Sequence, residues 1–198
     1  MHATLSDETL MCHYRDGDVR AFKELYQRHN AGLVRFIAWR APRKDWVEEI
    51  VQDSWANLHK ARERYQIESS FRTYLYQIAR NRLFDLLSQQ PVSLSSEVLV
   101  DVDDENYLFD AGESIHQPSS IDPESELERK QQVKNLHLAI RKLPNEQKEA
   151  LVLQQFNALS LDEIAQLTSV SVETVKSRLR YAMQKLRLAL QEMQGEQA

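Results

Sequence analysis

A helix with one buried face is predicted over Ser171-Val-Glu-Thr-Val-Lys-Ser-Arg-Leu-Arg-Tyr-Ala-Met-Gln-Lys-Leu-Arg187, because its apolar residues recur at a 3.6-residue period. The apolar stripe consists of Val172, Val175, Leu179, Ala182, Met183 and Leu186. The opposite face consists of Glu173, Thr174, Ser177, Arg180, Tyr181 and Gln184, with Lys176 and Arg178 at its edges. Cations outnumber the single anion Glu173 over this segment, so we expect its exposed face to attract phosphates.

The residues before this segment predict a second, shorter helix and a turn. Ser160-Leu-Asp-Glu163 is a capping box that starts a helix, Thr168-Ser-Val170 is too short and polar to continue it, and Ser171 is an N-cap. This is the spacing of a helix-turn-helix, whose second helix enters the DNA major groove. The predicted base contacts are then Glu173, Thr174, Ser177, Arg178 and Tyr181, and the predicted phosphate contacts are Lys176, Arg180, Lys185 and Arg187. Periodicity alone also fits an ordinary helical hairpin whose charges face water.

The exact residues resemble a known DNA-binding region. Glu163-Ile-Ala165 followed by Ser171-x-x-Thr-Val-Lys-Ser-Arg178, together with Leu143-Pro-x-Glu-Gln-x-x-Ala-Leu151 upstream, is similar to region 4 of extracytoplasmic-function sigma factors. The resemblance extends from Glu128 to Leu190. The family usually has Gly where this chain has Ser169 in the turn. If that position needs a positive φ, Ser169 adopts it at a cost of about 1 kcal/mol.

Composition favours an all-α fold. Only four glycines and five prolines occur among 198 residues, and apolar residues recur at helical rather than alternating spacing. With no apolar run long enough to span a membrane and no signal-peptide pattern, we expect a cytoplasmic protein without membrane insertion. Cys12 is the only cysteine, so no internal disulfide can form, and we expect a partly buried thiol on the first helix.

The formal net charge of −5 is unevenly distributed. Residues 89–128 carry eleven acids and no Lys or Arg, whereas the sequence on either side is net basic. We therefore expect two small helical domains, 1–88 and 128–198, joined by an extended acidic linker at 89–127. Composition by itself favours a solvated tether, but the resemblance implies a path through the RNA exit channel of the polymerase. Neutralising residues 101–105 should then alter initiation and leave promoter binding largely intact.

Helices are also expected along the N-terminal domain. Ser6 caps the first, which ends at Asp16-Gly17; a second carries Val19 to Tyr26, and a third carries Leu33 to Ile37 and ends before Pro42. A fourth is expected to start with Asp45 as its cap. Its outward face carries Glu49, Gln52, Asp53 and Asn57 at the spacing of one contact stripe.

By itself, this polar stripe could simply face water without binding a partner. However, Glu48-Glu-Ile-Val-Gln-Asp53 resembles the region 2 helix of sigma factors that binds the coiled coil of the polymerase β′ subunit. The resemblance therefore implies polymerase binding by Glu49, Gln52, Asp53 and Asn57.

A final N-terminal helix is expected from Phe71 to Asp85. Arg72, Tyr76, Arg80 and Asn81 are expected to face outward, a mixture that suits unpaired DNA because rings stack on bases and arginines hold the backbone. Ser70-Phe-x-Thr-Tyr-Leu-x-x-Ile-Ala-Arg-Asn-x-x-x-Asp85 resembles the sigma-factor region that melts the promoter and reads its downstream element. This resemblance implies that role for Arg72, Tyr74, Tyr76, Arg80 and Asn81. The family commonly has Trp at position 74 and a basic pair after the Asp, where this chain has Leu86-Leu-Ser-Gln-Gln.

Together the two resemblances imply an alternative sigma factor that binds core RNA polymerase through the β′ coiled coil and the β flap. Promoter DNA is its second expected partner, and an anti-sigma factor its third. The alternative is a helix-turn-helix repressor or activator that acts on duplex DNA without polymerase. We expect neither an enzyme nor a cofactor or metal site, because the sequence has no phosphate-binding Gly-rich loop, no His-Glu-x-x-His and no nucleophile elbow.

Overall fold

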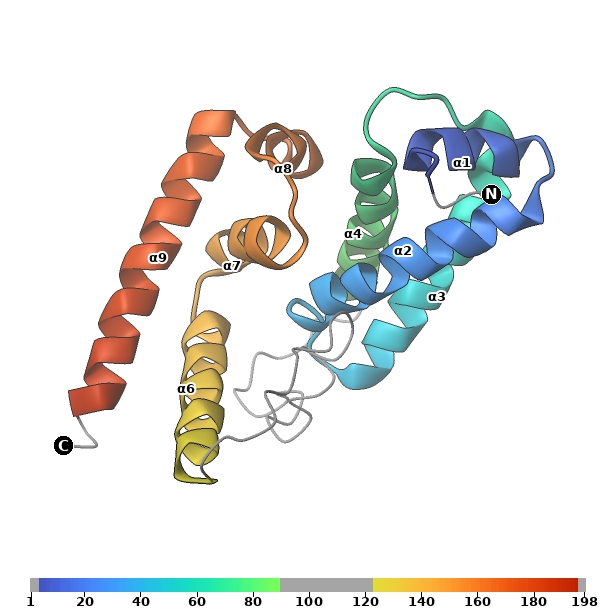
Figure 1. The fold of residues 1–198 in the computed structure, drawn as a ribbon. Coiled ribbons are helices and arrows are strands. Elements are labelled where there is room, and N and C mark those ends of the chain that lie inside the picture. The colour runs from blue at the N-terminus through green and yellow to red at the C-terminus, as the bar shows by residue number, and fades with distance from the viewer. Residues whose placement is uncertain (1–3, 90–122, 196–198) are drawn as a thin grey trace.

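The structure, a computed structural model, describes residues 4–89 and 123–195 of the chain. Residues 101–105 and most of the predicted acidic linker lie outside this part. The described residues form helices and connecting loops without a strand, which confirms the all-α expectation. They lie in two groups, which we name the N-terminal unit (α1 to α4) and the C-terminal unit (α6 to α9) (Figure 1). No helix in the described ranges is long and apolar enough to cross a membrane.

The N-terminal unit begins with two capped helices. Ser6 caps α1 (Asp7–Arg15) by accepting from the Thr9 N–H, and Asp18 caps α2 (Val19–Ala38). Gly17, with φ 106°, makes the turn between them in a conformation that costs other residues strain. The expectation of separate helices at Val19 to Tyr26 and Leu33 to Ile37 was wrong, because α2 continues through both.

Two further helices complete the N-terminal unit. These are α3 (Lys44–Ala61), followed by the short 3-10 turn η1 (Arg62–Arg64), and α4 (Phe71–Gln89). The expected cap of α3 was also wrong. Asp45 lies inside the first turn, where its carboxylate pairs with Arg43 at 2.7 Å, and Arg43 is the N-cap residue without a side-chain hydrogen bond.

The C-terminal unit starts inside the predicted linker, since α6 runs from Pro123 to Arg141. It continues with α7 (Asn145–Leu151), the π-helical turn η2 (Val152–Phe156), α8 (Leu161–Thr168) and α9 (Val172–Gly195). Asn157 follows η2 and donates from Nδ2 to the Val152 carbonyl at 3.1 Å, which ties its side chain to the start of the π turn.

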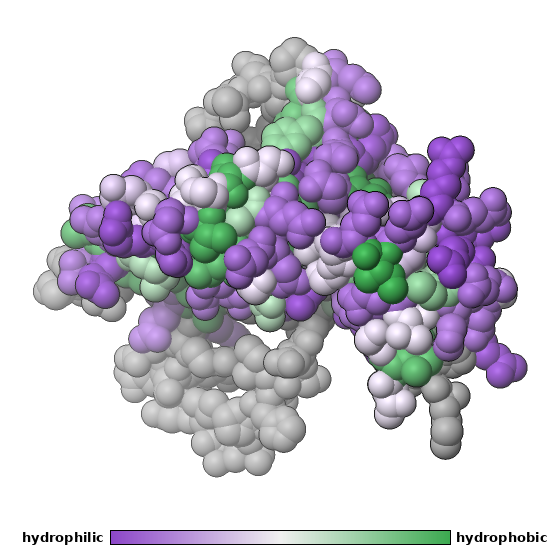
Figure 2. All heavy atoms as spheres, turned by 90° about the horizontal axis from the view of Figure 1, so that it is seen from above, coloured by the Kyte–Doolittle hydropathy of each residue, from purple (hydrophilic) through white to green (hydrophobic). Residues whose placement is uncertain are grey.

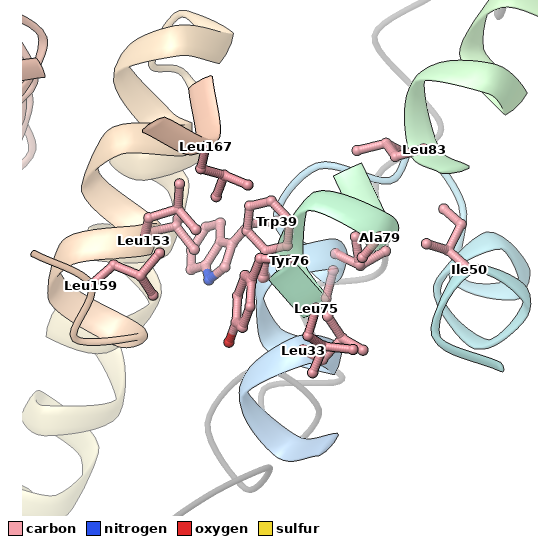
Figure 3. Close-up of a cluster of buried hydrophobic side chains, with 14 of the residues drawn as sticks. Leu33, Trp39, Ile50, Leu75, Tyr76, Ala79, Leu83, Leu153, Leu159 and Leu167 are labelled. Atoms are coloured by element: carbon pink, nitrogen blue, oxygen red, sulfur yellow. The ribbon is translucent and has the colours of Figure 1, made fainter. Parts of the chain in front are cut away.

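The apolar core continues from one unit into the other. Trp39, at the end of α2, lies beside Leu153 and Leu167 of the C-terminal unit, while Tyr76 of α4 lies close by (Figure 3). In Figure 1, α7 and α8 accordingly lie next to α2 and α4. The two units therefore bury apolar surface against each other. The outer face seen in Figure 2, by contrast, is mostly hydrophilic, with apolar side chains in small separate patches.

Candidate nucleic-acid and polymerase interfaces

The segment from α8 to α9 has the geometry of a helix-turn-helix. The Ser160 side chain accepts from the Glu163 N–H at 3.2 Å and Glu163 Oε2 accepts from the Ser160 N–H at 2.8 Å, so the predicted capping box is confirmed. Ser169 ends α8 in the left-handed region at φ 56° and ψ 43°. Ser171 Oγ then accepts from the Thr174 N–H, which confirms the predicted cap of α9.

The face of α9 predicted to contact DNA is open to solvent. Val175, Leu179, Ala182 and Leu186 are buried as predicted, but Met183 is 52% exposed, so its place on the apolar stripe was wrong. Of the nine predicted DNA contacts, Ser177 and Arg178 are half-buried, and the other seven are exposed: Glu173, Thr174, Lys176, Arg180, Tyr181, Lys185 and Arg187.

Local contacts orient several of these side chains. Lys176 Nζ lies 2.7 Å from Glu173 Oε1, one helical turn away, and the Arg180 guanidinium lies over the Tyr181 ring at 5.3 Å. The Glu173 carboxylate therefore offsets part of the positive charge of this face.

The polar stripe of α3 is a second open surface. Glu49, Gln52 and Asn57 are exposed and Asp53 is half-buried. The two acids are joined by Arg82 of α4, whose Nη2 donates to Glu49 at 2.7 Å and whose Nε donates to Asp53 at 2.6 Å. The sequence did not predict this bridge, because the pairing joins residues about thirty positions apart.

The third set of predicted residues, on α4, is only partly open. Asn81 is exposed, Arg72 and Arg80 are half-buried, and the half-buried Tyr74 ring lies 5.3 Å from the Tyr65 ring. Tyr76 is 2% exposed, so the expectation that it faces outward was wrong. Burial raises the pKa of its hydroxyl, which therefore remains a donor.

The C-terminal unit covers this part of α4. The Tyr76 hydroxyl donates to Asn157 Oδ1 at 2.8 Å, and Arg72 donates from Nη1 to the Asn157 carbonyl at 3.1 Å. Arg80 Nε donates to Glu149 Oε1 at 3.1 Å. Three of the five residues proposed for promoter melting are thus hydrogen-bonded to α7 or to the end of η2. No sequence pattern predicted these contacts, since they depend on how the two units pack.

The N-terminal end of α4 is fixed from both sides. Glu8 of α1 accepts from the Phe71 N–H at 2.9 Å, and Ser70 Oγ donates to Glu163 Oε1 of the capping box at 2.6 Å. Burial alone would raise the pKa of Glu163, but hydrogen bonds from Ser70 and Ser160 outweigh it and hold that pKa below its ordinary range. The Glu163 carboxylate therefore remains ionised while it connects α8 to α4.

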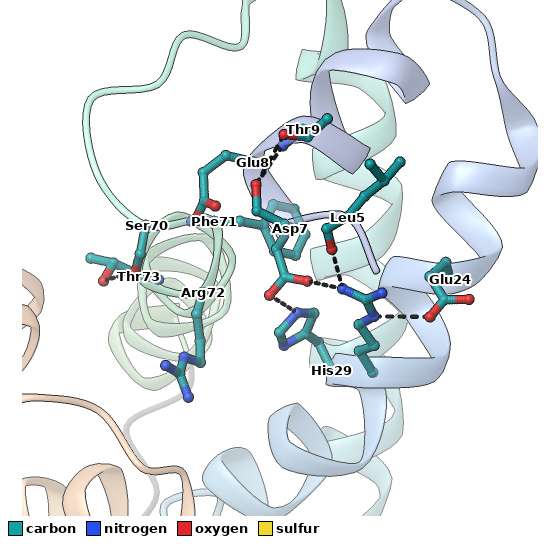
Figure 4. A network of polar contacts seen from close by, with 12 residues as sticks. Leu5, Asp7, Glu8, Thr9, Glu24, His29, Ser70, Phe71, Arg72 and Thr73 are labelled. Carbon is teal, nitrogen blue, oxygen red and sulfur yellow. Dashed lines mark hydrogen bonds and ion pairs between the residues drawn. The ribbon is translucent and has the colours of Figure 1, made fainter. Parts of the chain in front are cut away.

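The start of α1 is held by a neighbouring polar network (Figure 4). Asp7 accepts from Arg28 at 2.9 Å and contacts His29 at 2.7 Å, while Arg28 also reaches Glu24 and the Leu5 carbonyl. Burial would raise the pKa of Asp7, yet the contacts with His29 and Arg28 keep it below its ordinary value. This network holds Glu8 in place to cap α4.

An exposed cationic helix behind a capped turn defines a DNA-binding protein of the helix-turn-helix class. Residues 25–91 match the family described as Sigma-70 region 2, and residues 134–186 match Sigma-70, region 4. An ECF RNA polymerase sigma-E factor from Haemophilus influenzae is 29% identical over 179 residues, which are 90% of this chain and 92% of that relative. Its Escherichia coli K12 counterpart is 27% identical and covers 90% of this chain and 91% of its own length.

Two solved structures have a similar fold. CnrH in complex with the cytosolic domain of CnrY has a TM-score of 0.63 at 23% identity, over 94% of this chain and 97% of that one. The sigma factor RpoE in complex with the anti-sigma factor NepR from Bartonella quintana has a TM-score of 0.63 at 22% identity, over 87% and 98%. The chain belongs to the extracytoplasmic-function sigma factors.

Proposed function

We propose that this chain directs core RNA polymerase to a class of promoters. Separate surfaces would bind polymerase, bind the upstream promoter element and melt the promoter. The observation that carries the proposal is the distribution of its exposed polar residues. The recognition face of α9 and the polar stripe of α3 are both open, and they lie in different units of the molecule. One protein can therefore bind polymerase and duplex DNA at the same time.

The α3 stripe is the proposed polymerase contact. Glu49, Gln52, Asp53 and Asn57 would bind the β′ coiled coil, and Arg82 would act as a positioning residue because it holds Glu49 and Asp53 side by side. Replacing both acids with lysine should weaken core polymerase binding by at least about tenfold, since two attractive charges become repulsive. Replacing Glu63 and Glu68, two exposed acids outside the stripe, with lysine is the control matched in charge, and equal weakening by the control would reject this contact.

The remaining two surfaces are proposed to bind the promoter. Glu173, Thr174, Lys176, Ser177, Arg178, Arg180 and Tyr181 would contact the upstream element. Arg72, Tyr74, Tyr76, Arg80 and Asn81 would separate the strands and hold the downstream element, for which the C-terminal unit must first leave α4. The mechanism is binding and strand separation, and we propose no covalent chemistry. We place these events in the cytoplasm, with polymerase.

An anti-sigma factor is a further proposed partner. CnrH and the Bartonella RpoE are described in complexes, the second of them with an anti-sigma factor. We infer that a protein of this kind binds the present chain as well. The β flap of polymerase is proposed to contact the C-terminal unit.

Transcription by core polymerase with and without the added chain tests this function. The template is a library of duplex genomic fragments, with a matched set in which a short bubble is already melted. We expect new start sites on duplex fragments only when both proteins are present. Bubble templates should depend on the chain less strongly, because the melted region removes one of its tasks. No gain on any duplex fragment would reject the proposal, and duplex binding without polymerase would favour a repressor or activator.

A further inference from the structure

Two arginines of the N-terminal unit converge on one carboxylate oxygen of the C-terminal unit. Arg80 Nε donates to Glu149 Oε1 at 3.1 Å, and Arg40 Nη1 lies 2.8 Å from the same oxygen. Glu149 is 3% exposed, and the Arg40 side chain is 7% exposed. The Glu149 carboxylate thus fills a binding site for an anion that the N-terminal unit provides.

An aromatic ring holds the two guanidinium groups together. The Phe84 ring lies 4.6 Å from the Arg80 guanidinium carbon and 5.7 Å from that of Arg40. Stacking on a ring face fixes the plane of a guanidinium without consuming its hydrogen-bond donors. All three residues belong to the N-terminal unit, so we expect the pair to stay together when Glu149 is removed.

The surroundings of Glu149 are otherwise cationic. Burial lowers the pKa of Lys148, and the positive charges of Arg40 and Arg141 lower it further. Without the Glu149 carboxylate, the charge of Arg40 in the N-terminal unit would face those of Lys148 and Arg141 in the C-terminal unit with no anion between them. Their repulsion would favour separation of the two units at this point.

The same interface is tightly packed around Gly32 of α2. A Cβ atom added there would lie 2.8 Å from the Tyr76 hydroxyl oxygen and 3.2 Å from Asn157 Oδ1. Alanine favours a helix more than glycine does, so Gly32→Ala should leave α2 intact while it pushes Asn157 away from Tyr76. This substitution can separate the units without removing a charge.

We propose that Arg40 and Arg80 form a binding site for a backbone phosphate of single-stranded DNA, which Glu149 occupies while the two units are packed together. The inference rests on the proposed function, to which it adds Arg40 as a DNA contact and Glu149 as the group that blocks it. A phosphate oxygen, like the Glu149 carboxylate oxygen, carries negative charge and accepts hydrogen bonds from guanidinium groups. Tyr76 and Arg72 become accessible in the same step, because Asn157 moves with Glu149.

The test compares Glu149→Gln with Glu146→Gln in the full chain without polymerase. Both substitutions remove one negative charge from α7, but Glu146 is exposed. The probe is a labelled single-stranded DNA of about 20 nucleotides and mixed sequence, with a duplex of equal length as a second arm. We expect Glu149→Gln to bind the single strand about tenfold more tightly than Glu146→Gln. The two variants should bind the duplex equally, because α9 is already open.

The role of Arg40 is read from salt dependence. Arg40→Ala in the Glu149→Gln background should reverse most of the gain and lower the slope of log affinity against log salt by about 0.7, the value for one lost phosphate contact on a single strand. A residue that only supports the fold would leave that slope unchanged. Circular dichroism confirms that each variant keeps its helices.

Gly32→Ala keeps the proposal testable if Glu149→Gln fails to fold. It should also increase single-strand binding, and adding Arg40→Ala should again lower the salt slope. Equal binding by Glu149→Gln and Glu146→Gln, an equal gain on duplex DNA, or a gain that survives Arg40→Ala would each overturn the proposal. Because no polymerase is present, these outcomes are independent of the transcription test of the proposed function.

Discussion

At the scale of single residues, the sequence indicated the strained backbone of Ser169 but not the burial of His137. Ser169 was identified as the position where the family usually has glycine, and its φ of 56° confirms that the turn requires a left-handed conformation. His137 had no assigned role, yet it is 2% exposed and its ring meets the Trp39 ring edge-on at 5.4 Å. The turn was predictable because it depends on local geometry, whereas the burial of His137 depends on packing between the units.

Replacing Ser169 with glycine should stabilise the chain. Glycine adopts a positive φ without the Cβ clash that serine has, so the free energy of unfolding should rise by about 1 kcal/mol. Urea unfolding at neutral pH measures the change. Ser169→Ala is the control, because alanine keeps the Cβ and should give no gain. A gain of equal size in both variants would contradict the argument.

The burial of His137 should make stability depend on pH. Burial, with the nearby charge of Arg141, lowers the pKa of His137 from 6.5 to about 4. Above pH 6.5 the ring is neutral in both folded and unfolded chains. Between pH 6.5 and about 4 only the unfolded chain takes up the proton, so the free energy of unfolding should fall by up to about 1.4 kcal/mol per pH unit.

Comparison with His137→Leu isolates this effect. The variant has no ring to protonate, so its free energy of unfolding should fall less steeply between pH 6.5 and 5 in chemical unfolding experiments. Other titrating groups contribute to both proteins alike and cancel in the comparison. Identical slopes would mean that His137 does not carry the pH dependence.

At the scale of elements, the caps of α1, α8 and α9 were predicted correctly, whereas the cap of α3 and the length of α2 were not. The capping residues Ser6, Ser160 and Ser171 act through hydrogen bonds to residues three positions away, which a sequence displays directly. The continuity of α2 was missed because its buried face changes partner along its length, from α1 to the C-terminal unit. Met183 was misplaced because the side of α9 on which it lies is not covered by α6, α7 or α8.

The recognition helix α9 offers a matched pair of substitutions. Arg178→Ala should weaken binding to the upstream element by about 1 to 3 kcal/mol and relax the preference at one or two base pairs, because arginine is a bidentate ligand of guanine. Lys176→Ala should weaken binding to all sequences alike, as expected for a phosphate contact. Binding of promoter variants by the complete holoenzyme distinguishes the two patterns, and a uniform loss in Arg178→Ala would make Arg178 a phosphate contact instead.

At the scale of the whole molecule, the surfaces proposed to bind polymerase and the upstream element are open, whereas most of the residues proposed to melt the promoter are covered. The α3 stripe and the α9 face are open, whereas Tyr76 and the Arg40–Arg80 pair are covered by the C-terminal unit. The sequence indicated each of the proposed surfaces, because a helical period and a motif involve residues that are close together in the sequence. It did not indicate that one unit would cover the other, since the contacts of Glu149 and Asn157 join positions more than sixty residues apart. Binding to polymerase would therefore have to separate the units before the promoter can open.

Permanganate reactivity of unpaired thymines on a duplex promoter found in the transcription assay measures promoter opening directly. We expect strong reactivity near the start site only when the chain and core polymerase are both present, and a large loss when Tyr76 is replaced by alanine in a chain that still binds polymerase. Thymine reactivity with core polymerase alone, or none with both proteins together, would mean that this chain does not direct polymerase to promoters and open them.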